Sequence, residues 1–265
     1  MIKIAVIGIG GKMGSRIASL CTADPALELI AGTEAKGHPL IGSSKIQALS
    51  RELPNPVADS LDSIISKADI VIDFSTTAST LTNLAVALKA KKAIVIGTTG
   101  FKENEIKAIE KASKEIPVVL SPNMSVGVNL LFKLVKETAK VIPGYDIEII
   151  EAHHNQKKDA PSGTALKLAE EINSVLDEKL NVVTGRDGLC GPRKKNEIGV
   201  LAVRAGDIVG DHTVMFAGPA ERLELIHRAH SRDALAGGAL CAAKWLADKK
   251  PGLYNMQDVL FKEEN

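Results

Sequence analysis

The sequence lacks the features that mark secreted, metal-binding and membrane proteins. Its three cysteines, Cys21, Cys190 and Cys241, lie far apart and form no C-x-x-C pair, which argues against a disulfide framework and a thiolate metal site. No apolar stretch approaches the length of a membrane-spanning helix. The first residues run straight into glycines, without the charged and apolar regions of a secretory signal. We therefore expect a protein of the reducing cytoplasm that makes no contact with a membrane.

An excess of charge of one sign is also lacking. The chain has 33 basic and 32 acidic residues, which leaves a formal net charge of +1. This balance provides no broad electrostatic footprint for nucleic acid, so a small molecule is the expected partner. What remains is ordinary globular composition, because 45% of the 265 residues are hydrophobic and 25% are charged. The length suffices for one large or two modest domains.

Strand and helix patterns alternate in the N-terminal part of the chain. Short β-branched runs predict strands at Ile2–Ile7, Leu27–Ala31, Ile70–Asp73, Ala93–Ile96 and Val118–Ser121. Apolar residues at three- and four-residue spacing predict helices at Met13–Cys21, Ser79–Ala90 and Glu103–Lys114. This alternation predicts the α/β class, with a Rossmann-like, doubly wound parallel sheet covered by helices on both faces.

The pattern changes after Asn123. Helices are expected at Val126–Val141 and Thr164–Leu176, and strands at Asp146–Ala152, Gly199–Val203, His212–Ala217 and Arg222–His227. Consecutive strands without helices between them predict a second, α+β domain with a mixed sheet. The weakly polar helix expected at Asp233–Ala247 should pack back onto the first domain. We therefore assign residues 1–124 and 234–265 to a dinucleotide-binding domain, and residues 125–233 to a second domain.

A glycine-rich turn follows the first expected strand directly. Gly8, Gly11 and Gly14 have the spacing G-x-x-G-x-x-G, and a helical pattern opens immediately afterwards. A turn without Cβ atoms lets the backbone approach a pyrophosphate, whose charge the helix N-terminus stabilises. Glycines that merely permit tight packing of a helix on a sheet are the alternative interpretation.

An acidic residue stands at the distance from this turn that a dinucleotide site requires. Glu34 lies twenty residues beyond Gly14, just after the second expected strand, where a carboxylate can accept hydrogen bonds from the adenosine ribose. Turn, helix and acid together predict NADH or NADPH as cofactor. Glu34 would repel a 2′-phosphate, whereas Lys12 and Lys36 could attract one, so the choice between the two stays open.

A second small-residue turn, Gly97-Thr98-Thr99-Gly100, follows the expected strand at Ala93–Ile96. It belongs to the carboxyl edge, where open α/β sheets bind ligands, and its small side chains would let a nicotinamide or ribose come close. An ordinary surface loop would have the same composition.

The segment 151–165, E-A-H-H-N-Q-K-K-D-A-P-S-G-T-A, concentrates the polar chemistry of the chain. It lies between an expected strand and an expected helix. Pro161 and Ser162 are helix-start residues, so the N–H groups around Gly163 and Thr164 should face an anion site. Together with the two lysines and the paired histidines, this pattern predicts a receptor for carboxylates.

The histidines suggest a proton donor. His153 and His154 carry the side chain whose ordinary pKa lies nearest neutrality, which suits proton donation during a reduction. Hydride would come from the nicotinamide of the first domain and the proton from the second. Histidines satisfied by backbone carbonyls are the alternative. No metal site is expected, because no cysteine or nearby histidine completes a ligand set. We expect His212, His227 and His230 to be scattered structural or surface residues.

These motifs resemble those of the 4-hydroxy-tetrahydrodipicolinate reductase family, also called dihydrodipicolinate reductase. The segment E-A-H-H-x-x-K-x-D-A-P-S-G-T-A is similar to the family's signature, and the similarity extends in order and spacing over essentially the whole chain. The other similar segments are V-I-G-I-G-G-K-M-G at the start, I-D-F-S from Ile72, G-T-T-G-F from Gly97, P-N-M-S-V-G-V-N from Pro122 and A-H-S-R from Ala229.

The resemblance implies an activity and a set of site residues. The activity is the NADH- or NADPH-dependent reduction of a small dicarboxylate, 4-hydroxy-tetrahydrodipicolinate, to tetrahydrodipicolinate in the diaminopimelate route to lysine. His153 would be the proton donor and acceptor, Lys157 a second proton donor, and His154, Gly163 and Thr164 would hold a substrate carboxylate. The residues that would line the cofactor are Gly8, Ile9, Gly10, Gly11, Lys12, Met13, Glu34, Gly97, Thr98, Thr99, Ser121, Pro122, Asn123 and Met124. The family also implies a homotetramer joined through the sheets of the second, substrate-binding domain.

Three positions depart from the family's pattern. Ala35 stands where many members have an arginine after the ribose-binding acid, which puts a strong 2′-phosphate contact in doubt. Met124 and Leu235 stand where phenylalanine is common, and both could alter packing near the nicotinamide. Arg232 either reaches a phosphate or forms an ordinary surface salt bridge.

Two other functions are compatible with the first domain. A different two-domain nicotinamide reductase, such as an amino-acid or semialdehyde dehydrogenase, would share the glycine turn but not the segment 151–165. A nucleotide-sensing protein would use the dinucleotide fold without chemistry. It would bind NADH without oxidising it.

Overall fold

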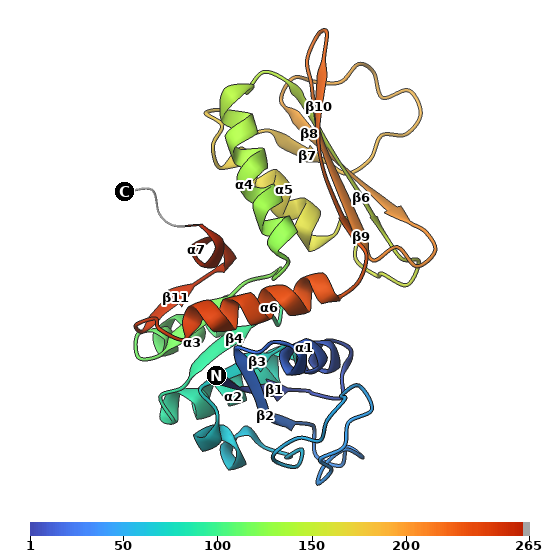
Figure 1. The fold of residues 1–265 in the computed structure, drawn as a ribbon. Coiled ribbons are helices and arrows are strands. Elements are labelled where there is room, and N and C mark those ends of the chain that lie inside the picture. The colour runs from blue at the N-terminus through green and yellow to red at the C-terminus, as the bar shows by residue number, and fades with distance from the viewer. Residues whose placement is uncertain (262–265) are drawn as a thin grey trace. The chain divides into compact units, whose positions relative to one another are not determined.

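The computed structural model describes residues 1–261, which form two compact units (Figure 1). Unit 1 comprises Met1–Val126 and the segment from Arg232 onward, and unit 2 comprises Gly127–Ser231. Within the described residues, no helix has both the length and the apolar character needed to cross a membrane.

Unit 1 is built on a six-stranded sheet in the order β11-β5-β4-β3-β1-β2. Its strands are β1 (Ile2–Ile7), β2 (Leu27–Thr33), β3 (Ile70–Asp73), β4 (Ala93–Ile96), β5 (Pro117–Leu120) and β11 (Gly252–Tyr254). Every neighbouring pair is parallel, which confirms the doubly wound parallel sheet. Because β1 lies between β2 and β3, the winding changes direction there, and such a switch point is where open α/β sheets bind ligands.

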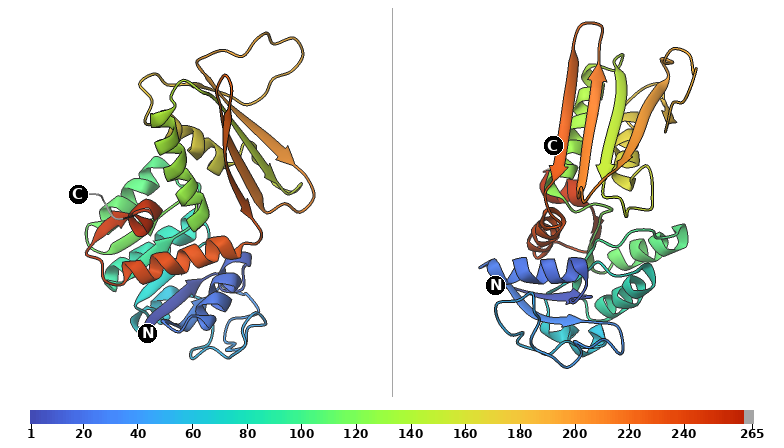
Figure 2. Two further views of the ribbon diagram at one scale, coloured as in Figure 1. Left: turned by 45° about the horizontal axis from the view of Figure 1, so that its top comes forward. Right: turned by 90° about the vertical axis from the view of Figure 1, so that its right-hand side faces the viewer.

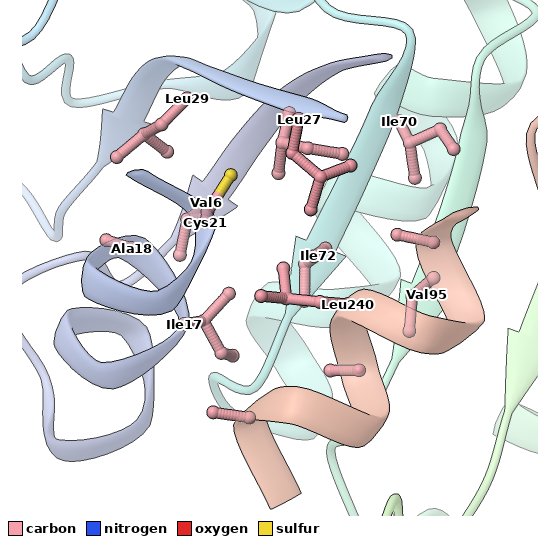
Figure 3. Close-up of a cluster of buried hydrophobic side chains, with 14 of the residues drawn as sticks. Val6, Ile17, Ala18, Cys21, Leu27, Leu29, Ile70, Ile72, Val95 and Leu240 are labelled. Carbon is pink, nitrogen blue, oxygen red and sulfur yellow. The ribbon is translucent and has the colours of Figure 1, made fainter. Parts of the chain in front are cut away.

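Helices cover both faces of this sheet. Helices α1 (Lys12–Ala23) and α6 (Asp233–Leu246) pack on one face, and α2 (Thr77–Lys89) and α3 (Glu103–Ser113) pack on the other. Figure 3 shows Ile17 of α1 and Leu240 of α6 beside Ile72 of β3, in the cluster that these helices bury. Helix α6 therefore returns to the first unit, as its weak polarity predicts.

Unit 2 is built on a five-stranded sheet in the order β10-β9-β6-β8-β7. Its strands are β6 (Asp146–His153), β7 (Asn181–Val183), β8 (Glu197–Arg204), β9 (Gly210–Ala217) and β10 (Arg222–Ala229). The expected mixed sheet is confirmed, because β6 is parallel to β8 and antiparallel to β9. The strands are seen side by side in the right-hand view of Figure 2.

Among residues 1–261, helices cover only one face of this sheet. Ile147 and Ile149 of β6 point into a core with α4 (Val126–Val141) and α5 (Gly163–Asn173). Side chains alternate between faces along a strand, so the next two residues on the helix-covered face are Glu151 and His153. The alternation that buries isoleucines in the middle of β6 therefore places polar groups at its carboxyl end.

The structure moves some expected boundaries and adds elements. Helix α5 ends at Asn173 rather than Leu176, because the Asn173 side chain exchanges two hydrogen bonds with the backbone of Leu180. Strand β5 ends at Leu120, one residue before its expected end. The strands β7 and β11 and the short helix α7 (Met256–Leu260) were not expected. Strands of three residues are too short to show a period and exist only through their pairing.

Candidate active site

Backbone geometry shapes the glycine-rich turn after β1. Gly8 has a φ of +66°, in the left-handed region that glycine adopts without strain, and its carbonyl accepts a hydrogen bond from Gly11 N–H at 2.9 Å. A Cβ at Gly14 would overlap the Gly8 carbonyl, so α1 approaches the turn as closely as glycine permits. The helix begins at Lys12 without a side-chain cap, which leaves its first N–H groups for an anion.

The acidic residue expected at the ribose lies directly against this turn. Glu34 Oε1 accepts a hydrogen bond from Gly10 N–H at 2.6 Å. A cavity of about 380 Å³ brings together Gly8, Glu34 and Ala35. Sequence reasoning missed other lining residues, among them Asp59, Ser60, Ser75, Thr76 and Asn83. Of these, Ser75 could have been predicted from the sequence, because it comes just after β3, at the sheet edge where open α/β sheets bind ligands. Backbone donors, a helix N-terminus and a carboxylate beside a cavity fit a dinucleotide.

The other expected cofactor residues shape turns at the same sheet edge. Gly97 follows β4 and leaves room for the Phe74 ring, which a Cβ would overlap. The buried Thr98 hydroxyl accepts a hydrogen bond from Thr80 Oγ1 at 2.9 Å, whereas Thr99 is exposed. After β5, Ser121 Oγ donates to the carbonyl of Asn123 at 2.9 Å.

Two expected cofactor residues have buried side chains. Ile9 and Met124 belong to the core beneath the sheet edge and are at most 1% exposed. Any contact of Ile9 with a ligand is therefore limited to its backbone. The Met124 carbonyl lies so close to α6 that a Cβ at Gly238 would overlap it.

A buried carboxylate organises the polar chemistry of unit 2. Glu151 is 0% exposed and accepts hydrogen bonds at 2.8 Å from each terminal nitrogen of Arg204. It also accepts one from Ser162 N–H at 2.9 Å and pairs with His153 Nδ1 at 2.6 Å. Burial acts to raise the pKa of Glu151, but the bonds from Arg204, His153 and Ser162 lower it below its ordinary value. Glu151 is therefore an ionised carboxylate.

His153 is a largely buried imidazole held by that carboxylate. Burial lowers its pKa, Glu151 partly offsets the effect, and the charges of Lys157 and Arg204 lower it further. The pKa therefore lies below the ordinary value of 6.5, and the imidazole is neutral at pH 7. Since an ionised carboxylate can only accept, Nδ1 carries the proton of this neutral ring.

His212, expected to be a scattered structural or surface residue, is a buried residue that lies beside His153. It is 3% exposed, its ring stands edge-on to that of His153 with centroids 5.3 Å apart, and its Nε2 lies 3.2 Å from Ser162 Oγ. Burial, followed by the charge of His153, lowers the pKa of His212 to about 3. The pairing of β6 with β9, which sets His212 opposite Glu151, was not visible in the sequence.

The expected anion site lies at the start of α5. Ser162 caps this helix, and its Oγ accepts a hydrogen bond from Ala165 N–H at 3.2 Å. Gly163 and Thr164 form the first turn. Lys157 is paired with Asp159 at 2.9 Å, and His154 is half-buried just beyond β6. Within residues 1–261, no three His, Cys, Asp or Glu side chains are grouped as a metal ion would require.

Both halves of the chain match models of one protein family. Residues 2–124 match "Dihydrodipicolinate reductase, N-terminus", and residues 127–260 match "Dihydrodipicolinate reductase, C-terminus". The 4-hydroxy-tetrahydrodipicolinate reductase of Geotalea daltonii is 47% identical over 264 residues, which cover 98% of this chain and 99% of that protein. The protein of the same name from Syntrophus aciditrophicus is 48% identical, with 98% of each chain covered.

A solved structure of the same family superposes on nearly the whole chain. It is the dipicolinate-bound dihydrodipicolinate reductase of Paenisporosarcina sp. TG-14, which superposes with a TM-score of 0.81 at 27% identity. The superposition covers 98% of this chain and 100% of that one.

Proposed function

The chain belongs to the dihydrodipicolinate reductase family, and from this premise we propose which residues perform its chemistry. The enzyme is an oxidoreductase that reduces 4-hydroxy-tetrahydrodipicolinate to tetrahydrodipicolinate with NADH or NADPH, in the diaminopimelate route to lysine. His153 is assigned as the proton donor, with Lys157 as a second donor. The observation that carries this assignment is the pairing of His153 with an ionised, buried Glu151 beside the N-terminus of α5.

Unit 1 would hold the cofactor. The backbone from Gly8 to Met13 would receive the pyrophosphate, and Glu34 would accept hydrogen bonds from the ribose. The turns Gly97–Thr99 and Ser121–Met124 would complete the lining at the carboxyl edge of the sheet. When bound, the reduced nicotinamide supplies a hydride to the substrate.

Unit 2 would hold the substrate and supply the proton. The N–H groups of Gly163 and Thr164, with His154 and Lys157, would bind its carboxylates, because a helix N-terminus and an ammonium group both favour negative charge. A dicarboxylate beside His153 adds negative charge, which favours the protonated ring. The imidazole that is neutral in the free protein would therefore take up a proton as substrate binds, and donate it during the reduction.

Unit 2 would also join subunits. The sheet face opposite α4 and α5 carries Ile150, Val203 and Ile226, which are 36%, 45% and 47% exposed in the single chain. Pairing such faces between copies would bury them. We therefore propose a homotetramer joined through these sheets, which a solution mass measurement tests. A cytoplasmic location fits the three free cysteines.

The decisive experiment compares wild type with His153→Ala. Wild type should oxidise NADH or NADPH only when it receives the freshly formed product of the preceding synthase. The variant should lose roughly two to four powers of ten in kcat, the usual contribution of general acid catalysis. Its dinucleotide affinity, a property of unit 1, should be unchanged and serves as the control. Full turnover by the variant would remove His153 from the mechanism, and a nucleotide sensor would bind NADH without oxidising it.

A further inference from the structure

Glu151 is fully buried, and its pairing with His153 supports the assignment of the proton donor, but Glu151 itself has no role in the proposed reaction. We propose that Glu151, fixed by Arg204 and Ser162, is a positioning residue for His153: it keeps the proton of the neutral ring on Nδ1 and leaves Nε2 to exchange a proton with the substrate. This inference rests on the proposed function of His153. It concerns how the ring is oriented and which nitrogen reacts.

The strand supplies the geometry of this pair. Glu151 and His153 are two positions apart on β6, so their side chains leave the same face, and Glu151 Oε2 lies 2.6 Å from His153 Nδ1. The carboxylate cannot turn away without cost, because three further hydrogen bonds, two from Arg204 and one from Ser162 N–H, hold it. The ring therefore has one fixed acceptor at Nδ1.

Arg204 keeps the carboxylate charged. It stands opposite His153 in the parallel pairing of β6 with β8, and its planar fork binds both oxygens of Glu151 at 2.8 Å. Arg204 also donates to the carbonyl of Asp159 at 2.6 Å, which ties the loop that carries Lys157 to the same group. A carboxylate neutralised in this way orients the imidazole without taking its proton.

Gly210 of β9 lies beside the opposite edge of the ring. A Cβ at this position would lie 3.0 Å from His153 Nε2, so any larger residue at position 210 would press against this nitrogen. The titratable and charged groups that face His153 are Glu151 from β6, Arg204 from β8, His212 from β9, and Lys157. Of these, only Glu151 is an acceptor that raises the pKa of His153.

The test replaces Glu151 by its neutral isostere. In Glu151→Gln the amide oxygen can keep its hydrogen bonds from Ser162 N–H and from Arg204 Nη2. The amide NH₂ then faces His153 Nδ1, which must become an acceptor, and the hydrogen bond from Arg204 Nη1 is lost. Nitrogen-15 NMR of His153 at alkaline pH should therefore show Nδ1–H in wild type and Nε2–H in the variant. We expect kcat to fall roughly 10²- to 10⁴-fold, with a smaller change in KM. The alkaline decline of kcat should move to lower pH, because a group that raises the pKa of His153 is lost.

Two further variants separate positioning from packing. Glu148, on the opposite face of β6, is bound by Arg186 at 2.9 and 3.1 Å and by Arg193 at 3.0 Å, so Glu148→Gln loses a comparable ion pair. It should leave the proton of His153 on Nδ1. Glu151→Asp keeps the charge and should retain the Nδ1–H form and recover part of the lost kcat.

The role of Glu151 can be tested whether or not Glu151→Gln folds. An Nε2–H ring in wild type, or a Glu151→Asp variant with an inverted tautomer, overturns it. So does a folded Glu151→Gln variant with unchanged tautomer and kcat. Any of these results would overturn the role of Glu151 but not the assignment of His153 as proton donor. Full activity of His153→Ala would instead refute that assignment. The NMR measurement of the tautomer in wild type would then still describe how Glu151 and His153 are paired.

Discussion

The two units build their candidate sites from different materials. In unit 1 the proposed pyrophosphate site is the turn from Gly8 to Gly14, which offers backbone N–H groups and close packing of α1, since a Cβ at Gly14 would overlap the Gly8 carbonyl. In unit 2 the group around His153 consists of charged and polar side chains from three strands and from Ser162 at the start of α5, with Glu151 at their centre. The first is a contiguous piece of chain, and the second is assembled by strand pairing.

This difference has an energetic consequence. Backbone donors at a helix N-terminus already point at the ligand site, so they need no partner from elsewhere in the chain. A buried carboxylate is tolerated only when it is paired and hydrogen-bonded, and removal of one partner leaves a costly charge. Substitutions that add volume should therefore weaken the site of unit 1, and substitutions that change a charge should weaken the site of unit 2.

After the losses expected for His153→Ala and Glu151→Gln, the next largest effect is expected from Lys157, another charge in unit 2. Lys157→Ala removes a cation that would bind a substrate carboxylate, and hydrogen bonds to charged groups contribute about 1.5–3 kcal/mol. The value of kcat/KM should fall roughly ten- to a hundredfold, while the affinity for NADH stays at the wild-type value. Steady-state kinetics and a fluorescence titration measure the two quantities. Unchanged kinetics would count against the assignment of Lys157.

The complementary change adds one methyl group in unit 1. Gly14→Ala forces α1 away from the Gly8 carbonyl, and such overpacking costs about 1–3 kcal/mol of unfolding free energy. The variant should also bind NADH more weakly, which titration and urea unfolding together would show. Gly144→Ala is the control, because a Cβ there meets nothing within 4 Å. Wild-type NADH affinity in Gly14→Ala would show that close approach of α1 is not required.

A change in pH should act on unit 2 through His212. Its pKa is lowered in the folded protein from 6.5 to about 3, so the unfolded chain binds the proton first. Stability is therefore complete above about pH 6.5 and is lost as the pH falls toward 3. At pH 5 the loss from this residue is about 2 kcal/mol. Urea unfolding at pH 8 and pH 5 measures the free energy of unfolding at both values. Between them, this free energy should fall less in His212→Asn than in wild type. An equal fall in the two proteins would contradict the role given to His212.

The smallest expected effect is the choice of cofactor in unit 1. The cavity beside the glycine turn is lined by Glu34, Ala35 and Asp59, and its described lining contains no lysine or arginine. Two carboxylates oppose a 2′-phosphate, so NADH should bind about tenfold more tightly than NADPH, a difference of about 1.4 kcal/mol. Parallel titrations at one salt concentration test this. Equal affinities would indicate that Lys12 or Lys36 reaches the phosphate.

Local patterns were sufficient for much of the fold. Strands β1, β3 and β4 have the bounds that their β-branched runs predict, because a buried parallel strand is apolar along its whole length. The same runs could not predict β7 or β11, since three residues carry no period. The end of α5 was misplaced for a related reason, because the Asn173 side chain bonds to Leu180, outside the helix.

The sequence alone determined the class of each unit, the glycine turn with Glu34, and the segment from Glu151 to Thr164, because each of these is a short-range pattern along the chain. Only the tertiary structure decided which groups surround His153. Arg204 lies 53 positions from Glu151, and it reaches that carboxylate because β8 pairs with β6 in one register. The tertiary structure also lowers the pKa values of His153 and His212, because desolvation depends on what packs around a group and not on its neighbours in the chain.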